Sequence, residues 1–432
     1  MKKLIEYIKH SVSSKVSSLQ TASVLTRVLA GVLTSKAIAV FIGPVGLALV
    51  GNLQNFVSSF QTIATLGLYK GMVKYIAKFK NHSIELSKTV SSIYYAGFFS
   101  TIFVSFFCYY NAEWINDIIF PTYNDYAYVI QVFAIVLPFY ALNLFSFSIM
   151  NGFSKHKTLV IINIIGQILS VSIVLVLISQ NRINGALISV AIAESLIFLI
   201  TLVSVVNRRS LMPIIKLSNV SYGLLKRMSV YSLMALFSAV LLPLIALAIR
   251  SYLIEHIGFK DAGFWEAMSR ISKYYLMVIT SLMTVYFFPS LSKINKTSVF
   301  KKEVFSFYKA VIPILAIGLL IIYLLRRYII LFVFSEEFEP VESLFFWQLL
   351  GDFIKILSIV IAYQFLAKKM FWHYVLTEAF LVVILYITSV YFINMCGVEG
   401  AVIAHFVSYI MYFGIILLIF GSSLFGIDKL SK

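Results

Sequence analysis

Residues 263–282 read GFWEAMSRISKYYLMVITSL, an apolar segment of membrane-spanning length that nevertheless carries three charges. Glu266, Arg270 and Lys273 stand at positions i, i+4 and i+7, so a helix places all three on one face. Lipid is excluded as the neighbour of that face, because a charge at the bilayer centre costs about 2.5–3.5 kcal/mol even on the lenient insertion scale. The stretch therefore predicts a membrane helix that faces a polar space enclosed by other helices of the chain.

The rest of the chain has the composition of a polytopic membrane protein. Of its 432 residues 60% are hydrophobic and 12% are charged, and the mean hydropathy is +0.93, which excludes a soluble domain of this size. Apolar spans of about 20 residues are predicted over 18–42, 45–68, 89–110, 127–150, 158–180, 184–206, 228–250, 263–288, 305–325, 343–366, 372–394 and 399–420. The sequence thus predicts an all-α integral membrane protein with about 12 transmembrane helices.

Lysine and arginine are unevenly divided between the predicted loops. The net charge is +17, and most lysine and arginine residues fall in the segments that lie inside when the N-terminus is cytoplasmic. Acidic residues such as Glu336 and Glu339 fall mainly in the outer loops. This positive-inside pattern explains the basic chain better than nucleic-acid binding does. Both termini are therefore expected in the cytoplasm, and residues 1–17 read as an amphipathic helix on the inner leaflet.

The chain also repeats itself at a nearly constant offset. Residues 184–188 (NGALI) match 399–403 (EGAVI), Gly43 matches Gly258 and Lys155 matches Lys369, at offsets of 215, 215 and 214. Each half holds an even number of spans, so the two halves sit the same way up in the membrane. The expected organisation is a cytoplasmic segment 1–17, a six-helix bundle 18–206, a basic linker 207–227, a second six-helix bundle 228–420 and a cytoplasmic tail 421–432.

Cations inside the predicted spans are the residues most indicative of function. They are Arg27, Lys36, Arg250, Arg270, Lys273 and Lys355, and the acidic residues at similar depth are Glu194, Glu266, Asp352 and Glu378. Intramembrane charges usually line a solute path, and a surplus of positive charge indicates an anionic substrate such as a pyrophosphate, which suits arginine. Lys36 and Arg250 lie near outer helix ends, where snorkelling to the interface is an alternative.

Polar residues at helical spacing complete the candidate site. Asn52 and Asn55 share a face of the second span, and Gln348, Asp352 and Lys355 form a single stripe in the tenth. Amide side chains both donate and accept hydrogen bonds, which suits sugar hydroxyls. We therefore expect substrate binding by Arg27, Arg270, Lys273, Lys355, Asn52, Asn55 and Gln348, and charge balance or ion coupling by Glu194, Glu266, Asp352 and Glu378.

A structural role for the same charges is an open alternative. Glu266 with Arg270, and Asp352 with Lys355, are spaced to form internal ion pairs that hold helices together. One glutamate cannot neutralise both cations of the eighth span, so this alternative is weaker there. His405 in the twelfth span is expected to be a buried, hydrogen-bonded histidine rather than a proton relay.

Catalytic and cofactor motifs are missing from the sequence. It contains no glycine-rich phosphate loop, no metal-spaced His/Cys cluster and no nucleophile with a base. Cys108 and Cys396 fit no metal spacing and are expected to be unpaired thiols. The chain is therefore expected to be a secondary transporter without a cofactor or metal, not an enzyme.

Several stretches, taken in order, carry a family resemblance. They are residues 43–47 (GPVGL), 71–75 (GMVKY), Trp265 with Ser269, 288–292 (FPSLS) and 347–355 (WQLLGDFIK). In this order and spacing they resemble the Wzx-type flippases of bacterial surface polysaccharides, which belong to the multidrug/oligosaccharidyl-lipid/polysaccharide exporter superfamily. The resemblance covers nearly the whole chain. It implies two six-helix bundles that form a V around a lumen, which opens inward and then outward.

The resemblance also implies a cargo and partners. The expected function is translocation of an undecaprenyl-pyrophosphate-linked oligosaccharide, the O-antigen repeat unit of lipopolysaccharide biosynthesis, from the cytoplasmic to the periplasmic leaflet of the bacterial inner membrane by alternating access. The alternatives are flipping of enterobacterial common antigen lipid III, a cation-coupled drug antiporter on the same fold, and a membrane enzyme. Expected partners are the lipid-linked oligosaccharide, the bilayer, and a polysaccharide polymerase with its chain-length regulator, but not nucleic acid.

Overall fold

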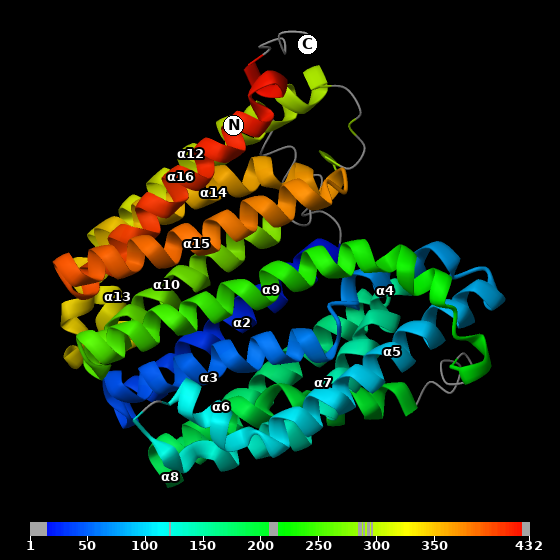
Figure 1. The fold of residues 1–432 in the computed structure, drawn as a ribbon, viewed down its shortest axis with the longest axis horizontal. Helices are drawn as coiled ribbons and strands as arrows, with labels where there is room; N and C mark the ends of the chain where they lie inside the picture. Colours follow the sequence, from blue (N-terminus) through cyan, green and yellow to red (C-terminus); the bar gives the residue numbers. More distant parts are fainter. Residues whose placement is uncertain are drawn as a thin grey trace. The chain divides into compact units, whose positions relative to one another are not determined.

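The computed structural model describes residues 15–120, 122–206, 215–283, 287, 290, 291, 294 and 297–425. Every regular element among these residues is a helix (Figure 1). Within this described part, nine helices are long and apolar enough to cross a bilayer. The predicted all-α, multi-pass membrane fold is confirmed.

The long helices follow the predicted spans closely. They are α2 (Lys15–Phe41), α3 (Gly43–Ala64), α5 (Ser83–Tyr110), α7 (Ala127–Gly152), α8 (His156–Val206), α9 (Tyr222–His256), α10 (Phe259–Leu282), α12 (Thr297–Leu324), α14 (Phe345–Ala367), α15 (Phe371–Cys396) and α16 (Val398–Phe425). The backbone of α8 leaves helical geometry at Asn181 (φ −126°) and Arg182 (φ 43°), so α8 contains two of the predicted spans. α3 and α10 fall outside the nine apolar helices, and α10 carries the charged stripe Glu266, Arg270 and Lys273.

Short helices lie between the long ones, and the span prediction missed them because none has the length of a span. They are α4 (Tyr69–Phe79), α6 (Ala112–Ile119), α13 (Arg326–Val333), η1 (Asn124–Tyr126), η3 (Leu217–Asn219) and η5 (Glu336–Leu344). α4 is amphipathic: Met72 and Ile76 are fully buried against α5 and α7, while Lys74 and Lys78 are exposed.

Internal contacts divide the chain into two compact units. The N-terminal unit comprises Lys15–Ile42 and Leu49–Leu247, and the described part of the C-terminal unit comprises Gly43–Ala48 and residues from Ala248 onward. The greater part of α9 thus groups with the helices before it, although the repeat assigns α9 to the second half. The bundle boundaries at 206 and 228, which follow the repeat, stay a prediction. Residues 1–14 of the predicted amphipathic segment, 207–214 of the linker and 426–432 of the tail lie outside the described residues.

In the N-terminal unit, the described part of the predicted linker is tied to α5. The backbone N–H groups of Lys216 and Ser221 donate to the Oγ atoms of Ser91 and Ser92 at 2.9 and 2.7 Å. The side chain of Asn219 donates to Ser87 at 2.7 Å. These bonds satisfy backbone groups that a loop would otherwise leave to water, so the chain enters α9 from a fixed point on α5.

In the C-terminal unit, η5 anchors several elements at the predicted outer end. Its side chains Phe338, Val341 and Leu344 are fully buried. Ion pairs link it to α13, since Arg326 contacts Glu342 at 2.9 Å and Arg327 contacts Glu339 at 3.7 Å. A cavity of about 420 Å³ lies at this junction, lined by Tyr323, Arg326, Glu339, Pro340, Glu342, Ser343 and Phe346.

The internal repeat reappears in the backbone. Residues with positive φ recur 215 positions apart, as Gly43 with Gly258, Ser154 with Lys369, and Arg182 with Gly397. The short helices α6 and α13, which the sequence did not predict, stand at nearly the same offset. These recurrences support the predicted repeat and correct one detail: Lys369 is equivalent to Ser154, not to Lys155.

Two glycines at equivalent turns show why the repeat needs them. A Cβ on Gly185 would lie 1.8 Å from the carbonyl oxygen of Leu177, and a Cβ on Gly400 would lie 2.0 Å from that of Phe392. The two glycines are 215 positions apart, and so are the two carbonyl groups. In each half a glycine therefore allows the start of the last helix to pack closely against the end of the helix before it.

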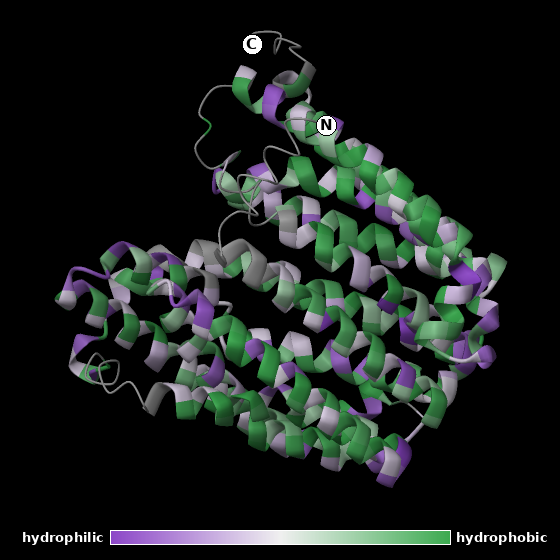
Figure 2. Cartoon of the chain, turned by 180° about the vertical axis from the view of Figure 1, so that it is seen from behind, coloured by the Kyte–Doolittle hydropathy of each residue, from purple (hydrophilic) through white to green (hydrophobic). Residues whose placement is uncertain are grey.

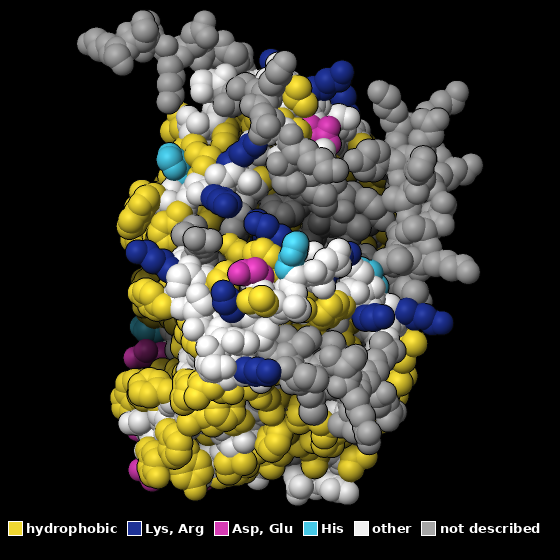
Figure 3. Space-filling view, turned by 90° about the vertical axis from the view of Figure 1, so that its right-hand side faces the viewer, with side chains coloured by type: hydrophobic (Ala, Val, Ile, Leu, Met, Phe, Trp, Pro, Cys, Tyr) yellow, Lys and Arg dark blue, Asp and Glu magenta, His cyan; other side chains and the backbone are white. Residues whose placement is uncertain are grey.

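The surface agrees with a bilayer environment. Hydrophobic residues run along the helices, and hydrophilic residues gather at the helix ends and loops (Figure 2). Many exposed side chains are large and apolar, among them Phe103, Trp372 and Leu418. On the side where α4 lies in Figure 1, lysine and arginine side chains are spread over the face (Figure 3). This basic face fits the predicted cytoplasmic side, although the orientation stays a prediction.

The close approach at Gly400 generates a test of the repeated turn. We expect Gly400→Ala to lower the melting temperature of the detergent-solubilised protein by several degrees, because the added methyl group meets backbone atoms that cannot move aside. Gly414→Ala, on the same helix α16 with nothing within 4 Å of its Cβ position, is the matched control and should melt at or slightly above the wild-type temperature. Equal melting of both variants would contradict the turn geometry.

Candidate functional site

Glu266 is the centre of a buried ion-pair group in the C-terminal unit. Its Oε1 accepts from Nε of Arg270 at 2.9 Å, one turn along α10, and its Oε2 accepts from Nη2 of Arg250 on α9. The three side chains are 0%, 5% and 1% exposed, respectively. The guanidinium of Arg250 also lies 5.2 Å from the ring centroid of Trp265. Arg250 is therefore a core residue, and the snorkelling alternative is wrong for it.

Lys273 continues the same stripe but differs in exposure. It lies within electrostatic range of Glu266, Arg250 and Arg270, yet its own side chain is exposed. Among the described residues, no carboxylate lies within ion-pair distance of its ammonium group. Of the α10 stripe, Lys273 is thus the cation within reach of a solute, while Arg270 is occupied by the ion pair that the structural alternative predicted.

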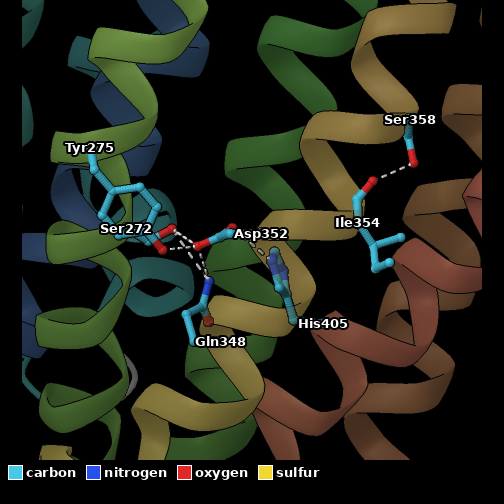
Figure 4. A network of polar contacts seen from close by, with 7 residues as sticks. All are labelled: Ser272, Tyr275, Gln348, Asp352, Ile354, Ser358 and His405. Atoms are coloured by element: carbon cyan, nitrogen blue, oxygen red, sulfur yellow. Dashed lines mark hydrogen bonds and ion pairs between the residues drawn. The ribbon is translucent and has the colours of Figure 1, made fainter. Parts of the chain in front are cut away.

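Asp352 is the centre of a second group, which joins three helices. Its Oδ2 accepts hydrogen bonds from Ser272 and Tyr275 of α10 and, at 3.2 Å, from Gln348 of α14. Its Oδ1 lies 3.1 Å from Nε2 of His405 on α16. Figure 4 shows the carboxylate between the α10 hydroxyls and the histidine. The fully buried carboxylate thus has polar partners on α10, α14 and α16.

Lys355, which the structural alternative pairs with Asp352, lies against Tyr409. Its Nζ lies 5.2 Å from the ring centroid of Tyr409, and it is within electrostatic range of Asp352 and Glu378. No ion pair within 4.0 Å joins it to Asp352 in the described part of the chain, which speaks against the structural alternative for this pair. Glu378 accepts a hydrogen bond from Tyr412 at 3.2 Å.

The N-terminal unit holds a smaller polar group. Glu194 on α8 accepts a hydrogen bond from Gln61 of α3 and lies within electrostatic range of Arg27 on α2 and of Tyr140 on α7. Both Arg27 and Glu194 have exposed side chains. Two of the predicted acid and base residues are thus brought together here. The group is distinct from the one in the C-terminal unit.

The predicted asparagines lie in different settings. Asn52 is fully buried and donates to the carbonyl oxygen of Ile119 at 2.8 Å, at the end of α6. Asn55 is also buried, at 8% exposure, but its Nδ2 has no hydrogen-bond partner among the described residues. An orphaned buried donor costs about 1–3 kcal/mol, so Asn55 is better suited than Asn52 to bind a ligand. Lys36 is half-buried on α2.

The sequence missed several members of these groups. Ser272 and Tyr275 were passed over, as were Gln61 and Tyr140. One signal was present in the sequence. His405, Tyr409 and Tyr412 recur at i, i+4 and i+7 on α16, which is the same spacing as that of the polar stripe on α14. His405 is hydrogen-bonded, as expected. In the described part of the chain no group of three or more His, Cys, Asp or Glu residues is arranged to hold a metal ion.

Comparison with known proteins adds to this geometry. Residues 12–295 match the family described as polysaccharide biosynthesis protein. The chain is 29% identical over 405 residues to the lipid III flippases of Escherichia coli (strain K12) and Shigella flexneri, covering 93% of this chain and 96% of each relative.

Solved structures share the fold at lower sequence identity. The lipid II flippase MurJ in an inward closed conformation has a TM-score of 0.71 at 16% identity, covering 94% of this chain and 87% of that protein. An inward-facing multidrug resistance MATE family transporter of the MOP superfamily has a TM-score of 0.68 at 15% identity, covering 94% and 96%. At such identities the likeness concerns the fold alone.

The four donors around Asp352 generate a test of its structural role. We expect Asp352→Ala to destabilise the protein by about 3 kcal/mol, because it leaves buried hydroxyl, amide and imidazole groups without their acceptor. Urea or thermal melting in detergent measures the loss.

The matched control for this test is Ser358→Ala on the same helix. Ser358 is equally buried, but its hydroxyl bonds only to the carbonyl of Ile354 on its own helix, at 2.8 Å (Figure 4). Its removal should cost less than about 1 kcal/mol. If Asp352→Ala melts like Ser358→Ala, the carboxylate does not organise its neighbours.

Proposed function

This chain belongs to the polysaccharide biosynthesis protein family, and on that premise we propose that it is a flippase for a lipid-linked oligosaccharide in the bacterial inner membrane. The observation that carries the proposal is the similarity to lipid III flippases over 93% of this chain. A multi-pass fold shared with transporters supports it. The cargo would pass from the cytoplasmic to the periplasmic leaflet by alternating access.

The comparisons favour one cargo over the other. The sequence suggested an O-antigen repeat unit first and enterobacterial common antigen lipid III second, and the relatives that match are named for lipid III. We therefore propose a lipid III type cargo, an oligosaccharide on undecaprenyl pyrophosphate. A polysaccharide polymerase and a chain-length regulator would act on the flipped product.

We propose that the pyrophosphate head binds Lys273 and Lys355 of the C-terminal unit. Lys273 is the exposed member of the α10 stripe, and the half-buried Lys355 lies within its electrostatic range. For Arg27, which is exposed in the N-terminal unit, we propose anion binding within that unit. Each ammonium or guanidinium group supplies charge-assisted hydrogen bonds to phosphate oxygens. Arg270 would contribute through its charge rather than by contact, since Glu266 occupies its Nε.

Sugar hydroxyls call for neutral groups, and the buried Asn55 is the best placed of these. Its Nδ2 lacks a partner, whereas Asn52 and Gln348 are bonded within the protein. Glu194, with its exposed side chain near Arg27, is a candidate for charge balance or ion coupling. Asp352 and Glu378 carry their own donors, which favours charge balance for them.

A drug antiporter with a cationic substrate fits the charges less well. The charged groups that act on Lys273 and Lys355 are Arg250, Arg270, Glu266, Asp352 and Glu378, and with the two lysines they have a surplus of positive charge. Such a group repels a cation and attracts an anion.

Removal of the exposed cation tests the proposal. We expect Lys273→Ala to reduce translocation of a labelled undecaprenyl-pyrophosphate oligosaccharide in proteoliposomes by roughly tenfold or more, because a desolvated charge-assisted contact to phosphate is lost. The same lipid carrying the lipid III oligosaccharide should move faster than one carrying an O-antigen unit.

Lys260→Ala is the matched control for this experiment. Lys260 stands on the first turn of the same helix, is 59% exposed and lies 3.9 Å from Glu337, so it is a surface lysine outside the candidate site. Its variant should keep transport near the wild-type rate. Transport at the wild-type rate by Lys273→Ala would refute the cationic site, and transport of neither lipid by the wild type would refute the flippase assignment.

A further inference from the structure

Arg250 is a buried cation that nothing in the candidate site yet explains. Glu266 and Arg270 already form an ion pair within α10, at the favourable i, i+4 spacing. Arg250 comes from α9, contacts the second oxygen of the same carboxylate and is 1% exposed. Burying a further guanidinium has a desolvation cost, and a single carboxylate offsets only part of it. The Arg250–Glu266–Arg270 triad therefore carries a net charge of +1 in the protein interior.

Arg250 reaches α10 from the point on α9 where the chain enters the C-terminal unit. It lies three residues beyond Leu247, where α9 passes from the N-terminal to the C-terminal unit. Its guanidinium stacks near Trp265, the residue before Glu266, so the side chain holds two successive residues of α10. A neutral side chain of similar length would keep the packing but not the charge.

The net charge of the triad acts on the electrostatic potential at Lys273. Lys273 lies on the same face of α10, one turn beyond Arg270, and Glu266 and both arginines are within its electrostatic range. Lys273 is exposed, whereas the triad is not. In the weakly polar interior of a protein a fixed charge acts over a longer distance than it does in water. The solute-accessible surface around Lys273 is therefore more positive than one ammonium group alone would make it.

We propose that Arg250 is a positioning residue for anion capture: as the second guanidinium on Glu266, it keeps the triad cationic and so raises the positive potential at the exposed Lys273. The ligand class is a diphosphate head group, and this part of the inference rests on the proposed function. The electrostatic part does not, because it concerns the protein without its cargo.

Thiol chemistry at position 273 measures the potential directly. In a background with the exposed Cys396 replaced by serine, Lys273→Cys places a reporter thiol, and the remaining Cys108 is fully buried. The quantity measured is the ratio of reaction rates with an anionic and a cationic methanethiosulfonate. Adding Arg250→Gln should lower this ratio by about threefold or more, because one nearby positive charge is removed in a region that is poorly screened.

Two further variants separate charge from packing. Arg250→Lys keeps the charge of the triad, and the double variant Arg250→Gln with Glu266→Gln restores its net charge of +1. Both should return the ratio toward that of the reporter background. An unchanged ratio in Arg250→Gln, or an equal fall in Arg250→Lys and in the double variant, would overturn the proposal. If Arg250→Gln does not fold, the Arg250→Lys and double variants still decide between charge and packing.

Transport then links the potential to capture. With Lys273 restored, Arg250→Gln should raise the concentration of lipid-linked oligosaccharide needed for half-maximal flipping by about threefold or more, and Arg250→Lys should rescue it. A change in transport without a change in the thiol ratio would overturn the inference. A change in the thiol ratio in a protein that flips no lipid-linked oligosaccharide would refute the proposed function and leave the electrostatic inference standing.

Discussion

Glu266 is a single buried carboxylate that two arginines share, and it ties α9 to α10 in the C-terminal unit. The two guanidinium groups outweigh the one carboxylate, so the group near Lys273 has a net positive charge. Ions inside a protein are tolerated only when they are paired and hydrogen-bonded. Glu266 meets this condition for itself, but it leaves one positive charge in excess. That excess makes the helix suited to an anionic solute, whereas a set of one-to-one ion pairs would have made it only a structural element.

The internal repeat brings polar residues to equivalent positions in the two halves, but the residue types at these positions differ. Tyr140 on α7 and Lys355 on α14 occupy equivalent positions, as do Glu194 on α8 and Tyr409 on α16. In each unit the two residues interact with one another. The same backbone geometry thus presents a polar pair to each unit, with an acid in the N-terminal unit and a base in the C-terminal one.

Hydropathy and helical spacing predicted most of the architecture. The apolar spans coincide with the long helices, including the break in α8 at Asn181 and Arg182, because the length of apolar segments is fixed by the bilayer. The amphipathic α4 was missed, since its 11 residues are too few for a span. The sequence also identified Glu266, Arg270, Lys273 and Asp352 as residues that avoid lipid. It did not identify Arg250 as a core residue, because the partner that buries it stands 16 positions away on another helix.

The sequence by itself determined the membrane class, the repeat and the faces on which charges fall, because each of these depends on local composition and a fixed helical period. Only the tertiary structure decided which charges are occupied and which are open. Asp352 was given hydroxyl, amide and imidazole partners rather than Lys355, and Lys273 rather than Arg270 was left exposed. Those outcomes depend on α9, α14 and α16, which bring donors and acceptors to α10 from distant parts of the chain. The spacing along one helix indicated the Glu266–Arg270 pair, but it carries no information about partners on other helices, which three-dimensional proximity decides.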